Sequence, residues 1–92
     1  MISAKEARLE TQSRLIQIAK EFIVNCAADA VREATKEGRF FATPSFEGVL
    51  NPEKTGVEVI RLLKEQGYEA EHVYYDGPNG YDNYILIKWE DD

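Results

Sequence analysis

The side chains best suited to catalysis in this chain are one histidine and one cysteine. His72 falls within an alternating stretch that predicts a strand, and Cys26 falls within a long helical stretch. Catalysis by side chains needs a nucleophile held against a base, or a paired acid and base. Zinc sites built from several cysteines and histidines are excluded by the count of one each. We therefore predict a protein that is not an enzyme and uses no cofactor or metal, with Cys26 buried as a small apolar residue.

Oxygen-bearing side chains around a turn-rich stretch form a second candidate site. Asp76, Asp82 and Asn83 lie around residues 77–81, and carboxylate and amide oxygens are ligands that calcium prefers. Their spacing does not match an EF-hand loop. The Asn79-Gly80 pair in the same stretch is a strong hairpin signal. The sequence therefore favours a solvated turn between two strands over a cation site.

Aromatic and basic side chains on the predicted strands form the most suggestive binding site. We expect the alternation along residues 69–75 and 84–89 to gather such side chains on the sheet face turned away from the helices, beside residues 39–41. Rings stack on a nucleobase while cations pair with phosphate, and the same residue types are favoured in protein interfaces. Packing of this face on the long helix, or on another subunit, is the alternative. The predicted ligand- or partner-binding residues are Arg39, Phe41, His72, Tyr74, Tyr84 and Lys88.

The elements that must position these residues begin with one long helix, predicted over residues 3–37. Ser3 and Glu6 form a capping box at its start, and Gly38 follows its last turn. Such a helix is a rod of roughly 50 Å, about twice the width of a compact domain of this length. The rod therefore overhangs the domain, breaks, or packs against another copy. The predicted oligomer contacts are Leu9, Leu15, Ile18 and Val24, with a core position as the alternative for the last two.

The rest of the chain predicts a strand over 39–43, a helix over 52–66 and a hairpin over 69–89. Pro44 ends the strand, Asn51 precedes the helix as its N-cap, and Gly67 ends the helix. The last strand is expected to turn Ile85, Ile87 and Trp89 toward the helices. Residues 1–92 are thus one α+β domain in the order α-β-α-β-β. Its helices pack on one face of a small antiparallel sheet of about three strands.

Charge is unevenly distributed along the chain, which carries a net −6. Residues 1–40 hold seven Lys and Arg against six Asp and Glu, whereas residues 41–92 hold four against eleven. The acidic second half argues against non-specific nucleic-acid binding and against an anionic membrane surface. Solubility is the simplest explanation of this charge, and mimicry of a nucleic-acid backbone is an alternative. No run of apolar residues is long enough to span a membrane, no signal segment precedes Ser3, and a single cysteine suits a reducing, cytosolic setting.

Three short stretches together resemble a recurrent protein type. They are the opening Ile2-Ser3-Ala4-Lys5-Glu6-Ala7, the helix end Leu63-Lys64-Glu65-Gln66-Gly67-Tyr68 and the closing Tyr84-Ile85-Leu86-Ile87-Lys88-Trp89. The chain resembles small uncharacterised proteins encoded by bacteriophages and prophages, which join an N-terminal helix, a middle helix ending in Gly-Tyr and a strand pair finishing at Trp. The resemblance implies phage origin and expression in the host bacterial cytoplasm, and it carries no catalytic motif.

These observations favour a protein that acts by binding. We expect a homo-oligomeric phage counter-defence factor that inhibits a bacterial immune system, either by covering a host protein or by sequestering a small nucleotide signal. A minor virion or assembly protein, in which the long helix builds a ring or shell contact, is one alternative. An acidic nucleic-acid mimic is the other.

Overall fold

The computed structural model describes residues 1–77 and 80–90, with side chains described for 1–74 and 83–90. It confirms the α+β class and the α-β-α-β-β order, because a long helical segment, a short strand, a second helix and two long strands follow one another. The elements are α1 (Ala4–Phe22), the π-helical segment η1 (Ile23–Ala27), α2 (Ala28–Lys36), β1 (Phe41–Ala42), α3 (Pro52–Glu65), β2 (Glu69–Gly77) and β3 (Gly80–Lys88).

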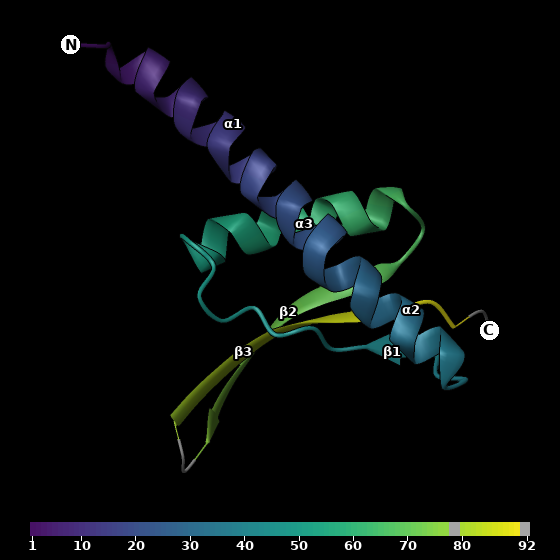
Figure 1. The fold of residues 1–92 in the computed structure, drawn as a ribbon. Helices are drawn as coiled ribbons and strands as arrows, with labels where there is room; N and C mark the ends of the chain where they lie inside the picture. The colour runs from purple at the N-terminus through teal and green to yellow at the C-terminus, as the bar shows by residue number, and fades with distance from the viewer. Residues whose placement is uncertain (78–79, 91–92) are drawn as a thin grey trace.

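The long N-terminal helix forms and projects from the body. The Ser3 hydroxyl accepts a hydrogen bond from the Glu6 N–H at 3.2 Å. Gly38 has a φ of 76°, and the following Arg39 N–H returns to the Ala34 carbonyl. The N-terminal half of α1 extends well past the other elements (Figure 1), and the Cα atoms span 52 × 35 × 22 Å. The radius of gyration of 14.8 Å exceeds the roughly 12 Å of a compact chain of this length.

The segment η1 corrects the prediction that the rod is a regular α-helix throughout. A π-turn holds one residue more than an α-turn, so it rotates the following residues relative to the preceding ones. The buried positions therefore step from Phe22 to Ala27, and Cys26 is exposed. The prediction of a buried Cys26 was wrong because it assumed an uninterrupted α-helical period.

The three strands form an antiparallel sheet in the order β1-β3-β2. Strand β1 is shorter than the predicted 39–43, because only Phe41 and Ala42 make ladder pairs with β3. The chain nevertheless continues beside β3, where the Pro44 carbonyl accepts from the Ile85 N–H and the Phe46 N–H donates to the Asn83 carbonyl.

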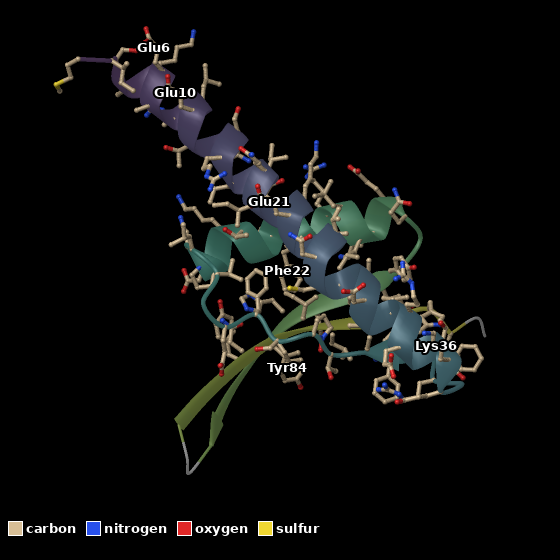
Figure 2. The ribbon with its side chains drawn as sticks, viewed as in Figure 1. Glu6, Glu10, Glu21, Phe22, Lys36 and Tyr84 are labelled. Atoms are coloured by element: carbon tan, nitrogen blue, oxygen red, sulfur yellow. The ribbon has the colours of Figure 1, made fainter. Side chains whose placement is uncertain are left out.

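The core lies between this sheet and the helices. Ile85 and Ile87 on β3 are fully buried, as are Phe46 from the loop before α3 and Val59 on α3. Phe22 closes the core from α1, with its ring edge-on to Phe46 at a centroid distance of 4.8 Å. In Figure 2 its side chain lies where α1 crosses the body, whereas Glu6 and Glu10 lie on the projecting end. The helices thus cover one sheet face and leave the other open.

Helix α3 begins and ends close to the predicted residues. Asn51 occupies the N-cap position in a left-handed conformation (φ 47°), and its carbonyl accepts from the Thr55 N–H. The Thr55 hydroxyl donates to the Leu50 carbonyl at 2.8 Å. At the other end the Tyr68 N–H returns to the Leu63 carbonyl, around Gly67. The chain therefore passes from α3 through a short turn into β2.

Candidate functional site

The open sheet face brings together four of the six predicted binding residues. Residues directly opposite each other in an antiparallel pair share a face, and β3 pairs Lys88 with Phe41 on one side and with Glu69 on the other. Tyr84 lies on the same face, and Arg39 approaches Phe41. We call this surface the outer face; its strand residues are Phe41, Glu69, Glu71, Val73, Tyr84, Leu86 and Lys88.

His72 and Tyr74 do not belong to the outer face, which corrects the predicted constellation. His72 pairs with the buried Ile85, and Tyr74 pairs with the buried Asn83. Both side chains therefore lie on the helix-covered face. The alternation within each strand was predicted correctly, but the register between β2 and β3 places even-numbered residues of one opposite odd-numbered residues of the other.

His72 is packed between the sheet and α3. Its ring lies 5.0 Å from the Phe46 ring and 4.2 Å from the Tyr74 ring, measured between centroids. Its Nε2 is in hydrogen-bonding contact with Asn83 Oδ1. On the α3 side it approaches the backbone of Gly56 so closely that a β-carbon there would lie 2.6 Å from Nδ1. These contacts give the single histidine a place in the packing of the helix on the sheet.

The cations of the outer face have carboxylates nearby. The Arg39 Nη2 lies 2.7 Å from Glu37 Oε2, and its Cζ lies 5.5 Å from the centroid of the Phe41 ring. Lys88 stands directly opposite Glu69. A phosphate group would have to compete with Glu37 for Arg39, and near Lys88 it would meet the negative charge of Glu69 on the neighbouring strand. The surface therefore suits a partner with mixed charges better than it suits a small anion.

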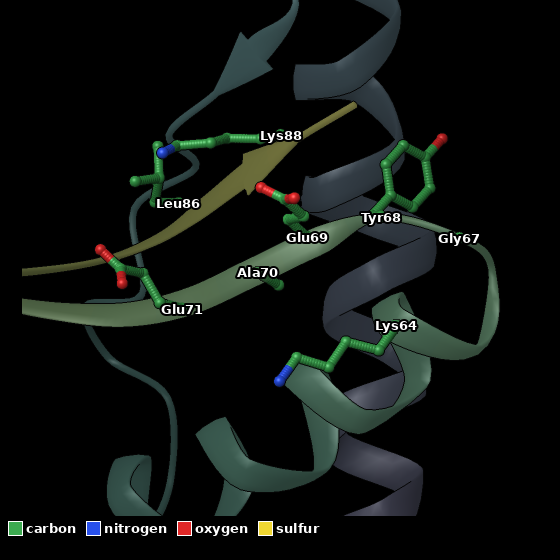
Figure 3. Close-up of a pocket in the computed structure, with 8 residues that line it drawn as sticks. All are labelled: Lys64, Gly67, Tyr68, Glu69, Ala70, Glu71, Leu86 and Lys88. Atoms are coloured by element: carbon green, nitrogen blue, oxygen red, sulfur yellow. The ribbon is translucent and has the colours of Figure 1, made fainter. Parts of the chain in front are cut away.

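A groove of about 560 Å³ joins the outer face to α3 along β2. In Figure 3 Lys64 reaches from α3 toward β2, while Leu86 and Lys88 lie across the sheet from it. The groove is lined by Lys64, Gly67, Tyr68, Glu69, Ala70, Glu71, Leu86 and Lys88. Residues of α3, of the turn after it and of strands β2 and β3 thus line one groove at the open side of the sheet.

The predicted oligomer contacts separate into exposed and covered residues. Leu9 is 62% exposed and Val24 is 69% exposed, whereas Ile18 is half-buried. Leu15 is only 6% exposed, so it belongs to the chain's own core and the prediction of an oligomer contact there was wrong. Val24 lines a second groove, of about 410 Å³, between η1 and the end of α3.

A polar network that joins α1 to α3 was not found from the sequence. Glu58 is buried and accepts from Gln12 Nε2 at 2.7 Å and from Arg61 Nη2 at 2.9 Å. Arg61 also reaches Glu65 at 2.8 Å. The hydrogen bond from Arg61 to Glu58 raises the pKa of the guanidinium above its ordinary value. The available signal was that Gln12 lies one heptad before the buried Ala19 and so shares its side of the helix, but this does not identify Glu58 as its partner.

Within the described residues, no group of three or more His, Cys, Asp or Glu is arranged to hold a metal ion. Of the three candidate cation ligands, the side chains of Asp76 and Asp82 lie outside the described residues, and Asn83 is buried against His72. The Asn79 half of the predicted Asn79-Gly80 turn also lies outside them. None of the described helices combines the length and apolar character of a membrane span.

Comparison of the chain with protein-family models, with curated protein sequences and with solved structures finds no significant match.

Proposed function

We propose that this chain is a non-catalytic, phage-encoded counter-defence factor that inhibits a bacterial immune system by covering a host protein in the bacterial cytoplasm. The observation that supports it is the outer face, a sheet surface that no described helix covers. It combines aromatic, aliphatic and oppositely charged side chains, and Phe41 remains 45% exposed on it. Protein interfaces are enriched in aromatic residues and arginine, and Phe41, Tyr84 and Arg39 supply these residue types here.

A host protein is favoured over a nucleotide signal by the arrangement of the same residues. Stacking and phosphate pairing require rings and free cations on one surface. Arg39 is instead engaged by Glu37, Lys88 stands beside Glu69, and two of the predicted rings lie on the other face. Host-protein binding needs only the shape and mixed charge of the outer face.

The phage origin in this proposal is supported by the resemblance of the opening, middle and closing stretches to small phage proteins. Homo-oligomerisation through the projecting helix belongs to the same proposal. It is supported by the exposure of Leu9 and Val24 and by the length of α1 that extends past the body (Figure 1).

The experiment expresses the chain in bacterial strains that each carry one defence system, and measures phage plating efficiency. We expect plating to be restored against one system, and the Phe41→Asp variant to lose the effect. Leu50→Asp, which changes an exposed apolar residue outside the outer face, should keep it. Failure to restore plating against any system in a broad panel would contradict the counter-defence function.

A minor virion or assembly protein is the second candidate, and the projecting α1 favours it because long helices serve as shell and ring contacts. Quantitative mass spectrometry of purified phage particles distinguishes the two. Stoichiometric copies in the particle would support the structural function, and absence from particles would contradict it.

A further inference from the structure

Strand β2 is an edge strand of the sheet along its whole length. The strand order β1-β3-β2 places it at the end, and it runs from Glu69 to Gly77. Its only strand neighbour among the described residues is β3. An edge of this length presents a row of backbone donors and acceptors that another extended chain can pair with.

The direction of these backbone groups follows from the hydrogen bonds of β3. The N–H groups of Ile85 and Trp89 point toward the β1 side, where they donate to the carbonyls of Pro44 and Phe40. Successive residues of a strand direct their backbone groups to opposite sides. The residues between them, Leu86 and Lys88, therefore bond to β2.

The partners of Leu86 and Lys88 on β2 are Glu71 and Glu69. By the same alternation the N–H and C=O groups of Ala70 and His72 point away from the sheet, toward the free edge. Among the described residues, no backbone hydrogen bond outside the helices and strands involves Ala70 or His72. The edge is therefore available at these two residues.

Helix α3 forms a wall beside this edge. Val57, Ile60 and Lys64 follow one another at steps of three and four, so they share one side of α3. Glu58 on the opposite side bonds to α1, and Lys64 lines the groove together with Glu69, Ala70 and Glu71 (Figure 3). Val57 is 64% exposed. A strand added to β2 would thus lay its inward side chains against Val57 and Ile60, beside the cation of Lys64.

We propose that the free edge of β2 binds an extended segment of a partner protein in which basic and apolar side chains alternate. This inference rests on the proposed function as a protein-binding factor and names the chemistry of the bound segment. The segment's backbone pairs with Ala70 and His72, its basic side chains meet Glu69 and Glu71 on the outer face, and its apolar side chains pack on Val57 and Ile60.

Charge favours such a segment over a second copy of the chain. Each chain carries a net −6, and antiparallel pairing of two β2 edges would bring Glu69 and Glu71 of both copies close together. Like charges on facing strands are destabilising. A basic segment would be attracted by the same two carboxylates, and more strongly by Glu71, which stands opposite Leu86, than by Glu69, which stands opposite Lys88.

The test uses fluorescent peptides of about seven residues, enough to span a strand, and measures binding by fluorescence anisotropy. One peptide alternates lysine with valine, and a second replaces each lysine with glutamate. A third is the lysine peptide with N-methyl groups on the amides that would face β2, which keeps its charge and removes its donors. We expect only the first to bind well, with affinity about tenfold or more above that of the third.

Two variants of the protein test the same contacts from the other side. Ala70→Pro removes one outward N–H and no sheet hydrogen bond, and proline is tolerated on the free side of an edge strand. This variant should therefore weaken binding of the lysine peptide. Glu71→Lys reverses the charge and should exchange the preference, so that the glutamate peptide binds better. Glu10→Lys on the projecting helix (Figure 2) makes the same charge change far from β2 and should alter neither affinity.

Hydrogen exchange identifies the site directly. The amides of Ala70 and His72 should become protected when the lysine peptide binds, whereas those of Glu69 and Glu71 are protected already. The proposal would be overturned if the lysine peptide did not bind, or if N-methylation did not weaken its binding. It would also be overturned if the amides of Ala70 and His72 became protected without peptide as the protein concentration rises, because a second copy of the chain would then occupy the edge. These readouts contain no host protein and no phage, so their failure is distinguishable from failure of the plating experiment.

Discussion

Gly56 on α3 and His72 on β2 are in such close contact that the imidazole occupies the space a side chain at position 56 would need. A β-carbon on Gly56 would lie 2.6 Å from His72 Nδ1, a distance that forces one group to move. Glycine costs helix stability of about 1 kcal/mol relative to alanine. Gly56 therefore permits the close contact between α3 and β2, and it lowers the intrinsic stability of α3.

Gly56→Ala should destabilise the protein despite the better helix propensity of alanine, by about 1–3 kcal/mol, as for other overpacked core positions. The measurement is the free energy of unfolding in urea. The double variant Gly56→Ala with His72→Ala relieves the overlap, so the alanine should be tolerated or stabilising in that background. A stabilising Gly56→Ala in the wild-type background would contradict the contact.

Gln12 and Glu58 should be energetically coupled, because the Gln12 amide donates to a buried carboxylate. A double-mutant cycle of Gln12→Ala and Glu58→Ala should give a coupling free energy of about 0.5–3 kcal/mol. Glu65→Ala is the matched control, since it removes an exposed partner of Arg61 and should change stability little. Additive effects of the two variants at 12 and 58 would show that the helices are not joined there.

Cys26 should react rapidly with a thiol reagent such as DTNB in the folded protein, because η1 turns it to solvent. Its rate should approach that of the urea-unfolded chain. Ala27→Cys in a Cys26→Ser background should be protected, since residue 27 is buried. The opposite order of reactivity would mean that the helix is regular through residues 23–27.

Leu9→Glu should lower the solution mass toward that of a monomer if the projecting helix is the oligomer contact, because it places a charge on an exposed apolar position. Multi-angle light scattering over a concentration series measures this. Glu10→Gln, on the same projecting segment, is the control and should keep the wild-type mass. A monomeric wild type at all concentrations would remove oligomerisation from the proposed function.

Element boundaries could be predicted because their signals are local. Ser3, Gly38 and Gly67 each act within one helical turn, and each works as expected. The open side of the sheet was also predicted correctly for Tyr84 and Lys88, since their alternation with buried Ile85 and Ile87 is strong.

The face on which each strand residue lies could not be predicted in the same way, because it depends on the pairing of distant residues. His72 and Tyr74 were placed on the wrong face because the face of β2 depends on its register with β3. Gly77 pairs with Gly80, and this register sets even-numbered residues of β2 opposite odd-numbered residues of β3. A two-residue loop at Asn79-Gly80 would predict the same opposition of even and odd residues, but the strands were predicted only over 69–75 and 84–89, which left their register open. The single extra residue of η1 has no such local signal.

The π-helical segment has a consequence for the length of the chain. Because it holds one surplus residue, a chain lacking one residue between Ile23 and Cys26 would form a regular helix and still present Ala27 and Ala34 to the core. Ile23 and Val24 of η1 line the groove against α3, and Ile23 also packs against the core. Shortening the helix by one residue would therefore reshape that groove while keeping Phe22 and Ala27 on one side of the helix.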